Sequence, residues 1–153
     1  MSRVKNIKDD YGFFGIGILN TTDEINIGTL WRSAYILGAS FIFTVGKKYQ
    51  LEGSDVTKAW TKIPLYHYQT FEELKENLPF STQLIAVEMG EEAKPISEFK
   101  HPDRAVYLLG NEISGLPQQA IEECQSVIKL PGEFSLNVAV SGSIIMYDRI
   151  NKN

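Results

Sequence analysis

The 153-residue sequence contains one cysteine, Cys124, two histidines and no long uninterrupted apolar run. A single cysteine permits no internal disulfide, which fits a reducing compartment, so we expect a cytoplasmic protein. No apolar stretch approaches the roughly 18 residues of a membrane span, and the first residues lack a signal-peptide core. The two histidines, His67 and His101, are too few for a zinc site with Cys124. We expect no metal and structural roles for both histidines.

Positive charge is also scarce, because 15 lysines and arginines face 19 acidic residues, for a net charge of −4. Taken alone, this balance argues against a protein that coats nucleic acid without specificity, but it does not exclude a local basic patch. Four lysines, with two aromatic residues among them, lie close together in the sequence: Lys47, Lys48, Tyr49, Lys58, Trp60 and Lys62. They form either an ordinary solvated surface or a candidate RNA contact.

Repeats, low-complexity segments and shifts of composition are absent too, so we expect residues 1–153 to form a single domain. Apolar strand-like runs alternate with helical patterns. This alternation favours an α/β fold with a mostly parallel sheet that helices cover on both faces. The expected strands are 14–19, 40–45, 63–68, 84–89, 105–109 and 126–130, and the expected helices are 26–37, 70–77, 117–124 and 136–150.

The last expected helix, 136–150, is apolar around most of its circumference until residues 147–149. A helix of this kind is buried on more than one side. It is either the central helix of a monomer or part of a homodimer interface, and we favour the homodimer because a chain of this size offers few places to enclose it.

Polar segments that contain glycine or proline follow two of the late strands, at 108–117 and 128–132, and a third segment, 135–142, begins the nearly all-apolar last helix directly after them. In α/β proteins the carboxyl ends of parallel strands are where ligands bind. Gly12, Gly15 and Gly17 do not form a dinucleotide-binding motif, because the third glycine of that motif would fall at Asn20. No P-loop sequence occurs either.

A further candidate is the segment 26–32, where Gly28 and Arg32 share one face of the expected helix. A glycine early in a helix costs about 1 kcal/mol relative to alanine, which indicates that something approaches closely there. Taken alone, Arg32 is either an ordinary surface arginine or part of a site.

Three segments, in order, resemble the motifs of the SpoU (TrmH-type) RNA 2′-O-ribose methyltransferases of the SPOUT class. They are Asn26-x-Gly28-x-x-x-Arg32 with Ala34 and Gly38-Ala39 after it, Leu109-Gly110-Asn111-Glu112-x-x-Gly115-Leu116-Pro117, and Ile128-x-Leu130-Pro131 followed by Ser135-Leu136-Asn137-Val138. The resemblance covers about residues 14 to 150, and it implies a single SPOUT domain with a C-terminal trefoil knot.

The resemblance also implies S-adenosylmethionine as methyl donor, S-adenosylhomocysteine as product, no metal, and a homodimer with its active site near the subunit interface. The implied cofactor-binding residues are Val87, Glu88, Leu109, Gly110, Glu112, Gly115, Ile128, Leu130, Ser135 and Asn137. The implied catalytic residues are Arg32, Asn26 and Asn137. Because arginine is effectively always protonated, we interpret Arg32 as an electrostatic clamp rather than a general base.

The expected substrate is an RNA, with no DNA or membrane partner. The small size resembles the tRNA-modifying members, which favours tRNA and leaves rRNA open. Lys47, Lys48, Lys58 and Lys62 would then contact the RNA. Two alternatives remain, a non-catalytic SPOUT-like dimer that binds cofactor or RNA, and a generic nucleotide-binding α/β domain.

Overall fold

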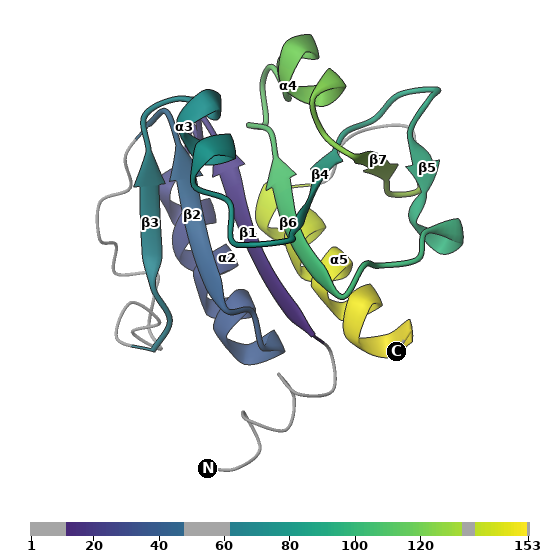
Figure 1. The fold of residues 1–153 in the computed structure, drawn as a ribbon, viewed down its shortest axis with the longest axis horizontal. Coiled ribbons are helices and arrows are strands. Elements are labelled where there is room, and N and C mark those ends of the chain that lie inside the picture. Colours follow the sequence, from purple (N-terminus) through teal and green to yellow (C-terminus); the bar gives the residue numbers. More distant parts are fainter. Residues whose placement is uncertain (1–11, 48–61, 133–136, 153) are drawn as a thin grey trace.

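The computed structural model describes residues 12–47, 62–132 and 137–152. Within these ranges, seven strands form one sheet in the order β3-β2-β1-β6-β4-β7-β5 (Figure 1). All the strand pairings are parallel, so the predicted parallel α/β sheet is confirmed. The strands are β1 (Phe13–Leu19), β2 (Phe41–Val45), β3 (Leu65–Tyr68), β4 (Gln83–Val87), β5 (Lys94–Pro95), β6 (Arg104–Leu109) and β7 (Ser126–Lys129).

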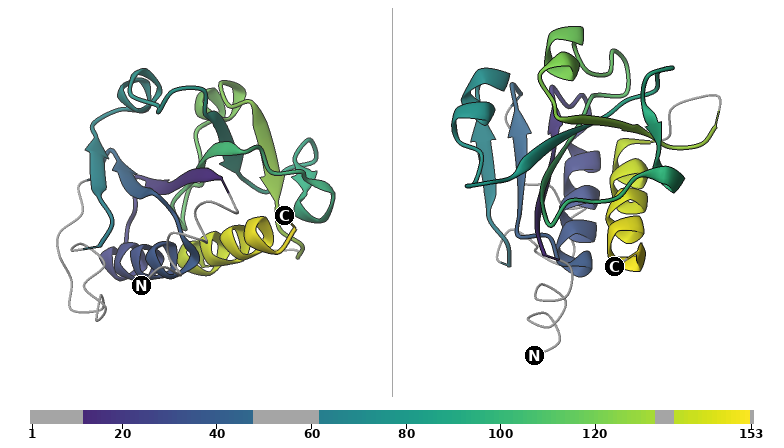
Figure 2. Two further views of the ribbon diagram at one scale, coloured as in Figure 1. Left: turned by 60° about the horizontal axis from the view of Figure 1, so that its bottom comes forward. Right: turned by 45° about the vertical axis from the view of Figure 1, so that its right-hand side comes forward.

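Two long helices, α2 (Glu24–Leu37) and α5 (Val138–Lys152), lie side by side on one face of the sheet (Figure 2). The shorter helices α3 (Phe71–Glu76) and α4 (Gln118–Glu122) pack on the opposite face, and a 3-10 turn, η2 (Ile96–Glu98), follows β5. None of the helices within the described ranges is long and apolar enough to cross a membrane.

Local sequence explains where the helices begin and end. The Asp23 side chain accepts a hydrogen bond from the backbone of Ile25 and starts α2, and Gly38 ends the helix with φ of 91°. Thr70 caps α3 by accepting from the backbone of Glu73 at 3.1 Å. The Glu73 carboxylate accepts in return from the backbone of Gln69, one residue before the cap.

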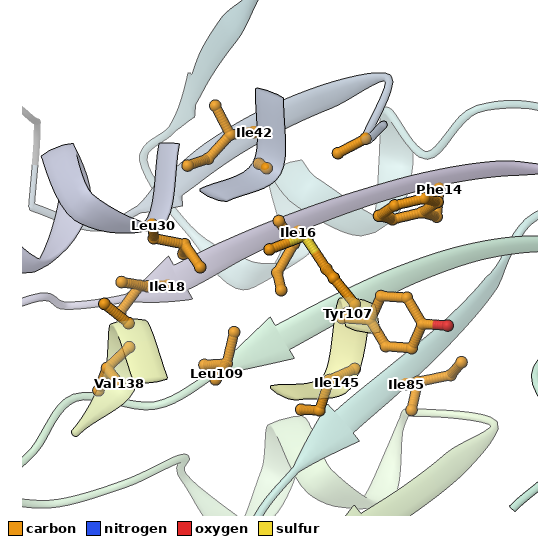
Figure 3. Close-up of a cluster of buried hydrophobic side chains, with 14 of the residues drawn as sticks. Phe14, Ile16, Ile18, Leu30, Ile42, Ile85, Tyr107, Leu109, Val138 and Ile145 are labelled. Carbon is orange, nitrogen blue, oxygen red and sulfur yellow. The ribbon is translucent and has the colours of Figure 1, made fainter. Parts of the chain in front are cut away.

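Side chains that alternate along the strands build two hydrophobic cores, one on each face of the sheet. The core beneath α2 and α5 includes Ile16, Leu30, Tyr107, Leu109 and Ile145 (Figure 3). The second core lies under α3 and α4 and takes the alternate strand residues. Both faces are therefore apolar, which is why the strands occur in the sequence as nearly continuous apolar runs.

The glycines of β1 make room for aromatic rings of the neighbouring strand. A β-carbon on Gly15 would overlap the ring of Phe41, and one on Gly17 would overlap Phe43. Gly15 and Gly17 therefore serve packing in the second core.

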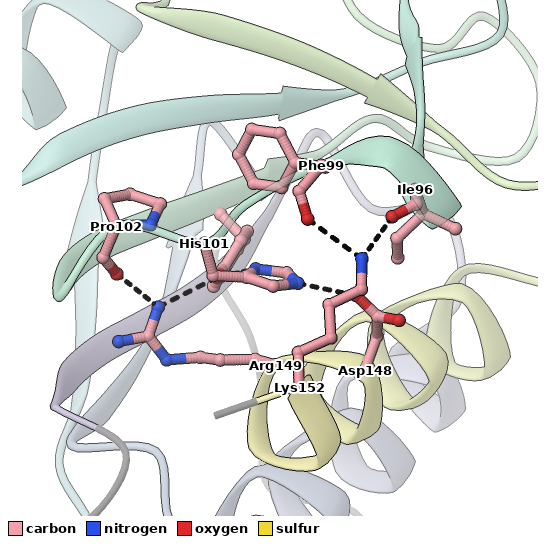
Figure 4. Close-up of polar contacts among 8 residues, drawn as sticks. Ile96, Phe99, His101, Pro102, Asp148, Arg149 and Lys152 are labelled. Carbon is pink, nitrogen blue, oxygen red and sulfur yellow. Dashed lines mark hydrogen bonds and ion pairs between the residues drawn. The ribbon is translucent and has the colours of Figure 1, made fainter.

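A buried polar cluster joins the end of α5 to the start of β6 (Figure 4). Arg149 is fully buried and donates to the carbonyls of Pro102 and Asp103 and to the Tyr107 hydroxyl, at 2.7, 2.9 and 3.1 Å. His101 lies between the Tyr107 hydroxyl, at 2.6 Å, and the Asp148 carboxylate, at 2.7 Å. The structural role predicted for His101 is confirmed, and so is that of His67, whose Nδ1 lies 2.9 Å from the buried Thr44 hydroxyl.

Some element bounds differ from the sequence predictions. The fourth strand ends at Val87 rather than 89, and α4 ends at Glu122 rather than 124. The short elements β5 and η2 have no counterpart among the predictions, because two or three residues are too few to show a periodic pattern.

Candidate active site

A cavity of about 360 Å³ opens at the carboxyl edge of β4, β6 and β7. Three chain segments line it: residues 87–89 after β4, 109–115 after β6, and 129–131 with 137–141 around the start of α5. The described residues of the three predicted segments, 108–117, 128–132 and 135–142, therefore contribute to one cavity. Its volume falls within the range of about 300–1,000 Å³ that is typical of small-molecule sites.

The loop after β6 is closed by its own hydrogen bonds. The Asn111 side-chain oxygen accepts from the backbones of Ile113 and Ser114, at 2.9 and 2.8 Å, and the Gly115 amide donates to the Asn111 carbonyl at 3.1 Å. Gly115 has φ of 65°, and a β-carbon on Gly110 would overlap the Gly115 backbone. Both glycines are therefore required by the fold of the loop itself.

Glu88 attaches this loop to the end of β4. Its carboxylate accepts from the backbone of Leu116 at 2.8 Å and from that of Met89 at 3.0 Å. The Glu88 backbone also donates to the Ile128 carbonyl of β7 at 3.0 Å. Glu88 thus joins the end of β4 to the loop after β6 and to the end of β7.

A second polar network connects the cavity to the start of α2. One Glu112 oxygen accepts from the Thr22 hydroxyl at 2.5 Å, and the other accepts from the side-chain amide of Asn26. The Asn26 oxygen accepts in turn from the Asn137 amide at 3.0 Å. Because both carboxylate oxygens of Glu112 have partners, its geometry is that of a residue that positions the loop.

Asn137 also caps α5, because its side-chain oxygen accepts from the backbones of Ala139 and Val140, at 2.8 and 3.2 Å. With its oxygen occupied by the cap, its amide nitrogen points to Asn26. One residue from each of the three motif segments, Asn26, Glu112 and Asn137, therefore belongs to a single network.

The sequence matches the family described as the SpoU rRNA Methylase family over residues 14–147. This chain belongs to that family. It is also 23% identical over 133 residues to the tRNA (guanosine(18)-2′-O)-methyltransferase TARBP1 of Mus musculus, a match that covers 80% of this chain and 8% of that protein. The chain therefore spans a small part of that relative.

Solved structures of SpoU proteins share the fold. The methyltransferase AviRb of Streptomyces viridochromogenes, in complex with AdoMet, superimposes with a TM-score of 0.82 at 21% identity, over 94% of this chain and 60% of that one. The TrmH/SpoU tRNA modifying enzyme of A. aeolicus gives 0.79 at 19% identity, over 99% and 82%. A structure described by the 2-OH methylation of C/U34 on tRNA gives 0.81 at 19% identity, over 92% and 96%.

Most of the cofactor-binding residues predicted for this SpoU protein line the cavity. Ile128 does not, because its side chain is fully buried beneath it, and Ser135 lies outside the described residues. Those that line it are Val87, Glu88, Leu109, Gly110, Glu112, Gly115, Leu130 and Asn137. The sequence reasoning missed Thr22, whose contact with Glu112 joins positions 90 residues apart, and the lining residues Met89 and Ser141.

Arg32 lies apart from the cavity of its own chain. It is exposed on α2 and is not among the lining residues. It follows Asn26 by six residues, which on a helix is about 9 Å along the axis and about 120° around it. Asn26 is buried against Glu112 and Asn137, whereas the Arg32 side chain leaves the helix on a different face.

Of the four predicted RNA-binding lysines, Lys48 and Lys58 lie outside the described residues. Lys47 follows the carboxyl end of β2, whereas Lys62 precedes the amino end of β3, which runs parallel to it. The two described lysines are exposed at opposite edges of the sheet, so the structure does not join them in one patch. Of these two, Lys47 lies at the same edge of the sheet as the cavity.

In the ranges that the structure covers, no group of histidine, cysteine, aspartate and glutamate side chains is arranged to hold a metal ion. Cys124 donates to the Ala120 carbonyl, and burial raises the pKa of its thiol to about 11, which leaves it protonated and unreactive. The arrangement is suited to holding a ligand and presenting it to a second molecule.

Proposed function

We propose that this protein is an S-adenosylmethionine-dependent RNA methyltransferase that modifies a ribose 2′-hydroxyl, with tRNA favoured over rRNA as substrate. The observation that carries this proposal is the network of Asn26, Glu112 and Asn137 at the rim of one cavity. Family membership supplies the reaction class, and two of the relatives described above are named for tRNA methylation.

The cavity suits the proposed cofactor. Leu109, Leu130 and Val138 offer apolar contacts for an adenine ring, and the turns beside them present backbone groups for its edge. Glu88 and Glu112 also line the cavity and place negative charge near a cationic sulfonium. When bound, S-adenosylmethionine supplies an activated methyl group, so the protein's own residues need to orient the acceptor hydroxyl and exclude water.

We propose that the acting unit is a homodimer. On α2, Ile25, Thr29, Arg32 and Ile36 follow a helical spacing and are all exposed, with 55% and 54% exposure for the two isoleucines. On the adjacent α5, Val140, Ile144 and Tyr147 form a second exposed stripe. An apolar groove of about 310 Å³ runs between the two helices.

A second copy of the chain is the occupant that explains the position of Arg32. Arg32 belongs to the exposed stripe of α2 and does not line the cavity of its own chain, so a partner that covers this stripe would contact it. We therefore propose that Arg32 serves the cavity of the partner subunit. There it would bind a phosphate next to the acceptor ribose and stabilise negative charge that develops on the 2′-oxygen.

The C-terminal trefoil knot is also a proposal. The strand order places β7 between β4 and β5, and α5, the next described element, begins beside Asn26 on the face of the sheet that α2 covers. This arrangement of late segments is compatible with a threaded chain end, and such threading is rare among folds in general.

A binding and a transfer measurement test the function. At about 100 times its Kd, S-adenosylhomocysteine should stabilise the protein by about 2.7 kcal/mol in thermal unfolding. Radiolabelled methyl groups should then move from S-adenosylmethionine to tRNA of a strain that lacks the gene, with the label on the ribose. Binding without transfer would favour the non-catalytic dimer, and no stabilisation would favour a generic nucleotide-binding domain.

A further inference from the structure

A second cavity, of about 230 Å³, lies at the same edge of the sheet as the first. It is formed where β1, β2 and β3 end, and α4 with the preceding Pro117 closes its other side. None of the predicted cofactor-binding residues lines it. Its polar lining includes Asn20, Gln69, Glu72 and Gln119.

The two cavities are neighbours that share a wall. Gly115 lines the first cavity and Pro117 lines the second, so the chain between them separates the two. On the other side, Asn20 lines the second cavity, and two residues later the Thr22 hydroxyl bonds to Glu112 of the first. The two cavities are therefore adjacent along this edge of the sheet.

The floor of the second cavity is already ordered. The Asn20 amide donates to the Val45 carbonyl, and the Gly46 amide donates to the Tyr68 carbonyl, both at 2.8 Å. These bonds tie the ends of β1, β2 and β3 together. The Asn20 side-chain oxygen lies against Gly46, in the space that a β-carbon there would occupy.

The polar groups in this cavity match a neutral heterocycle. The side-chain amides of Asn20 and Gln69 have no hydrogen-bond partner among the described residues, and each offers a donor and an acceptor. A base edge presents the same two kinds of group. Glu72 adds an exposed carboxylate to the lining, which would repel a phosphate but accept from an amino or imino group of a base.

We propose that the second cavity binds a nucleobase of the RNA substrate, next to the ribose that is methylated. The exposed Lys47 directly follows Gly46, which lines the cavity, so the phosphate that joins the two nucleotides would pass near a positive charge. This inference rests on the proposed function and adds to it a place where the enzyme recognises the sequence around its target.

The test uses Gln69→Ala and Asn20→Asp, alone and combined. Asp tolerates the left-handed backbone of Asn20, which has φ of 53°, but it cannot donate. Each variant should lower kcat/KM for tRNA from the gene-deleted strain by about 5-fold, the scale of one lost hydrogen bond, and the pair by about 20-fold. The Kd of S-adenosylhomocysteine should stay unchanged. The matched control is Gln83→Ala, because Gln83 is an exposed amide side chain at the amino end of β4, at the opposite edge of the sheet.

A second measurement identifies the ligand class. In NMR spectra of the intact protein, nucleoside 5′-monophosphates should shift the side-chain amide signals of Asn20 and Gln69, whereas inorganic phosphate should not. Equal shifts with phosphate alone, or unchanged kcat/KM in the double variant, would overturn the proposal. If the unaltered protein methylates no RNA, the proposed function fails instead, and the monophosphate titration still decides whether the cavity binds a base.

Discussion

The two ends of α5 carry polar networks of opposite character. At its start, Asn137 joins Asn26 and Glu112 at the rim of an open cavity. At its end, Arg149 lies fully buried among carbonyls and the Tyr107 hydroxyl, and above the ring of Phe14 at 5.0 Å. Both networks are well bonded, but only the first leaves space beside it for another molecule.

The comparison teaches that hydrogen bonding alone does not mark a functional site. In the buried cluster, Arg149 donates to Tyr107, and the tyrosine hydroxyl can donate to a neutral His101, which can donate to Asp148. Burial raises the pKa of Tyr107 to about 12, so its hydroxyl keeps its proton. Every polar group in this series of hydrogen bonds already has a partner, so we infer that the cluster stabilises the fold.

The largest effect is expected in the buried network, from the substitution Arg149→Met. Three charge-assisted hydrogen bonds and the stacking on Phe14 are lost, so the free energy of unfolding should fall by about 3 kcal/mol. Urea denaturation measures the change. Arg104→Met is the control, because Arg104 also lies over a ring, Phe13, at 4.6 Å, but is only half-buried; it should cost less than about 1 kcal/mol.

Arg32→Ala should leave stability and cofactor affinity intact and lower kcat by about 100-fold, the scale of one preorganised donor. A mixed dimer sharpens the test. Gly110→Val should abolish cofactor binding, because the loop cannot close around a side chain. If Arg32 serves the partner's cavity, a heterodimer of the two inactive variants contains one complete site and regains activity. A heterodimer as inactive as its parents would place Arg32 in its own subunit's site.

A smaller effect is expected when the network at the cavity, Asn26 with Glu112 and Asn137, is altered by a substitution that keeps the size of the side chain. Asn26→Asp places a carboxylate against Glu112, and the resulting repulsion should weaken S-adenosylhomocysteine binding by about 10-fold in calorimetry, which corresponds to about 1.4 kcal/mol. Asn151→Asp, at the exposed far end of α5, should bind like the unaltered protein. If the two variants bind S-adenosylhomocysteine equally well, the contact between Asn26 and Glu112 does not contribute to cofactor binding.

The smallest effect concerns pH and the buried cluster. Burial lowers the pKa of His101, and this effect is larger than the opposing effect of the Asp148 carboxylate, which raises it. The unfolded chain therefore takes up the proton first as the pH falls, so stability is present above the ordinary histidine pKa of about 6.5 and is lost below it. Denaturation midpoints from pH 8 to 5 should show this decline, and His101→Gln should flatten it. In His67→Gln the decline should persist.

The sequence was sufficient to predict features that depend on residues adjacent in the chain or on the spacing of apolar residues. The Thr70 cap, the Gly38 helix end and the apolar runs of the parallel strands each depend on a few adjacent residues. The candidate cavity followed from the rule that parallel strands end at one edge. The contact of Thr22 with Glu112 could not be predicted, because it depends on how distant segments pack.

The position of Arg32 illustrates the other limit. Its helix and its exposure follow from the local pattern, but its distance from the cavity depends on the rotation of α2 against the sheet, which packing of Ile27, Leu30 and Trp31 sets. Likewise, Ile128 lies in the predicted strand, yet its side chain faces the core rather than the cavity. Strand ends can be located from sequence more easily than the direction of each side chain.

The self-closed turn after β6 has a consequence for the thermodynamics of recognition. Because Asn111, Gly115 and Glu88 already restrain its backbone, an incoming molecule need not freeze a mobile chain, and little conformational entropy is lost on association. The amide hydrogens of Ile113, Ser114 and Leu116 should accordingly exchange slowly with deuterated water before any ligand arrives. Affinity at this site would then reflect direct contacts with a template that is already formed.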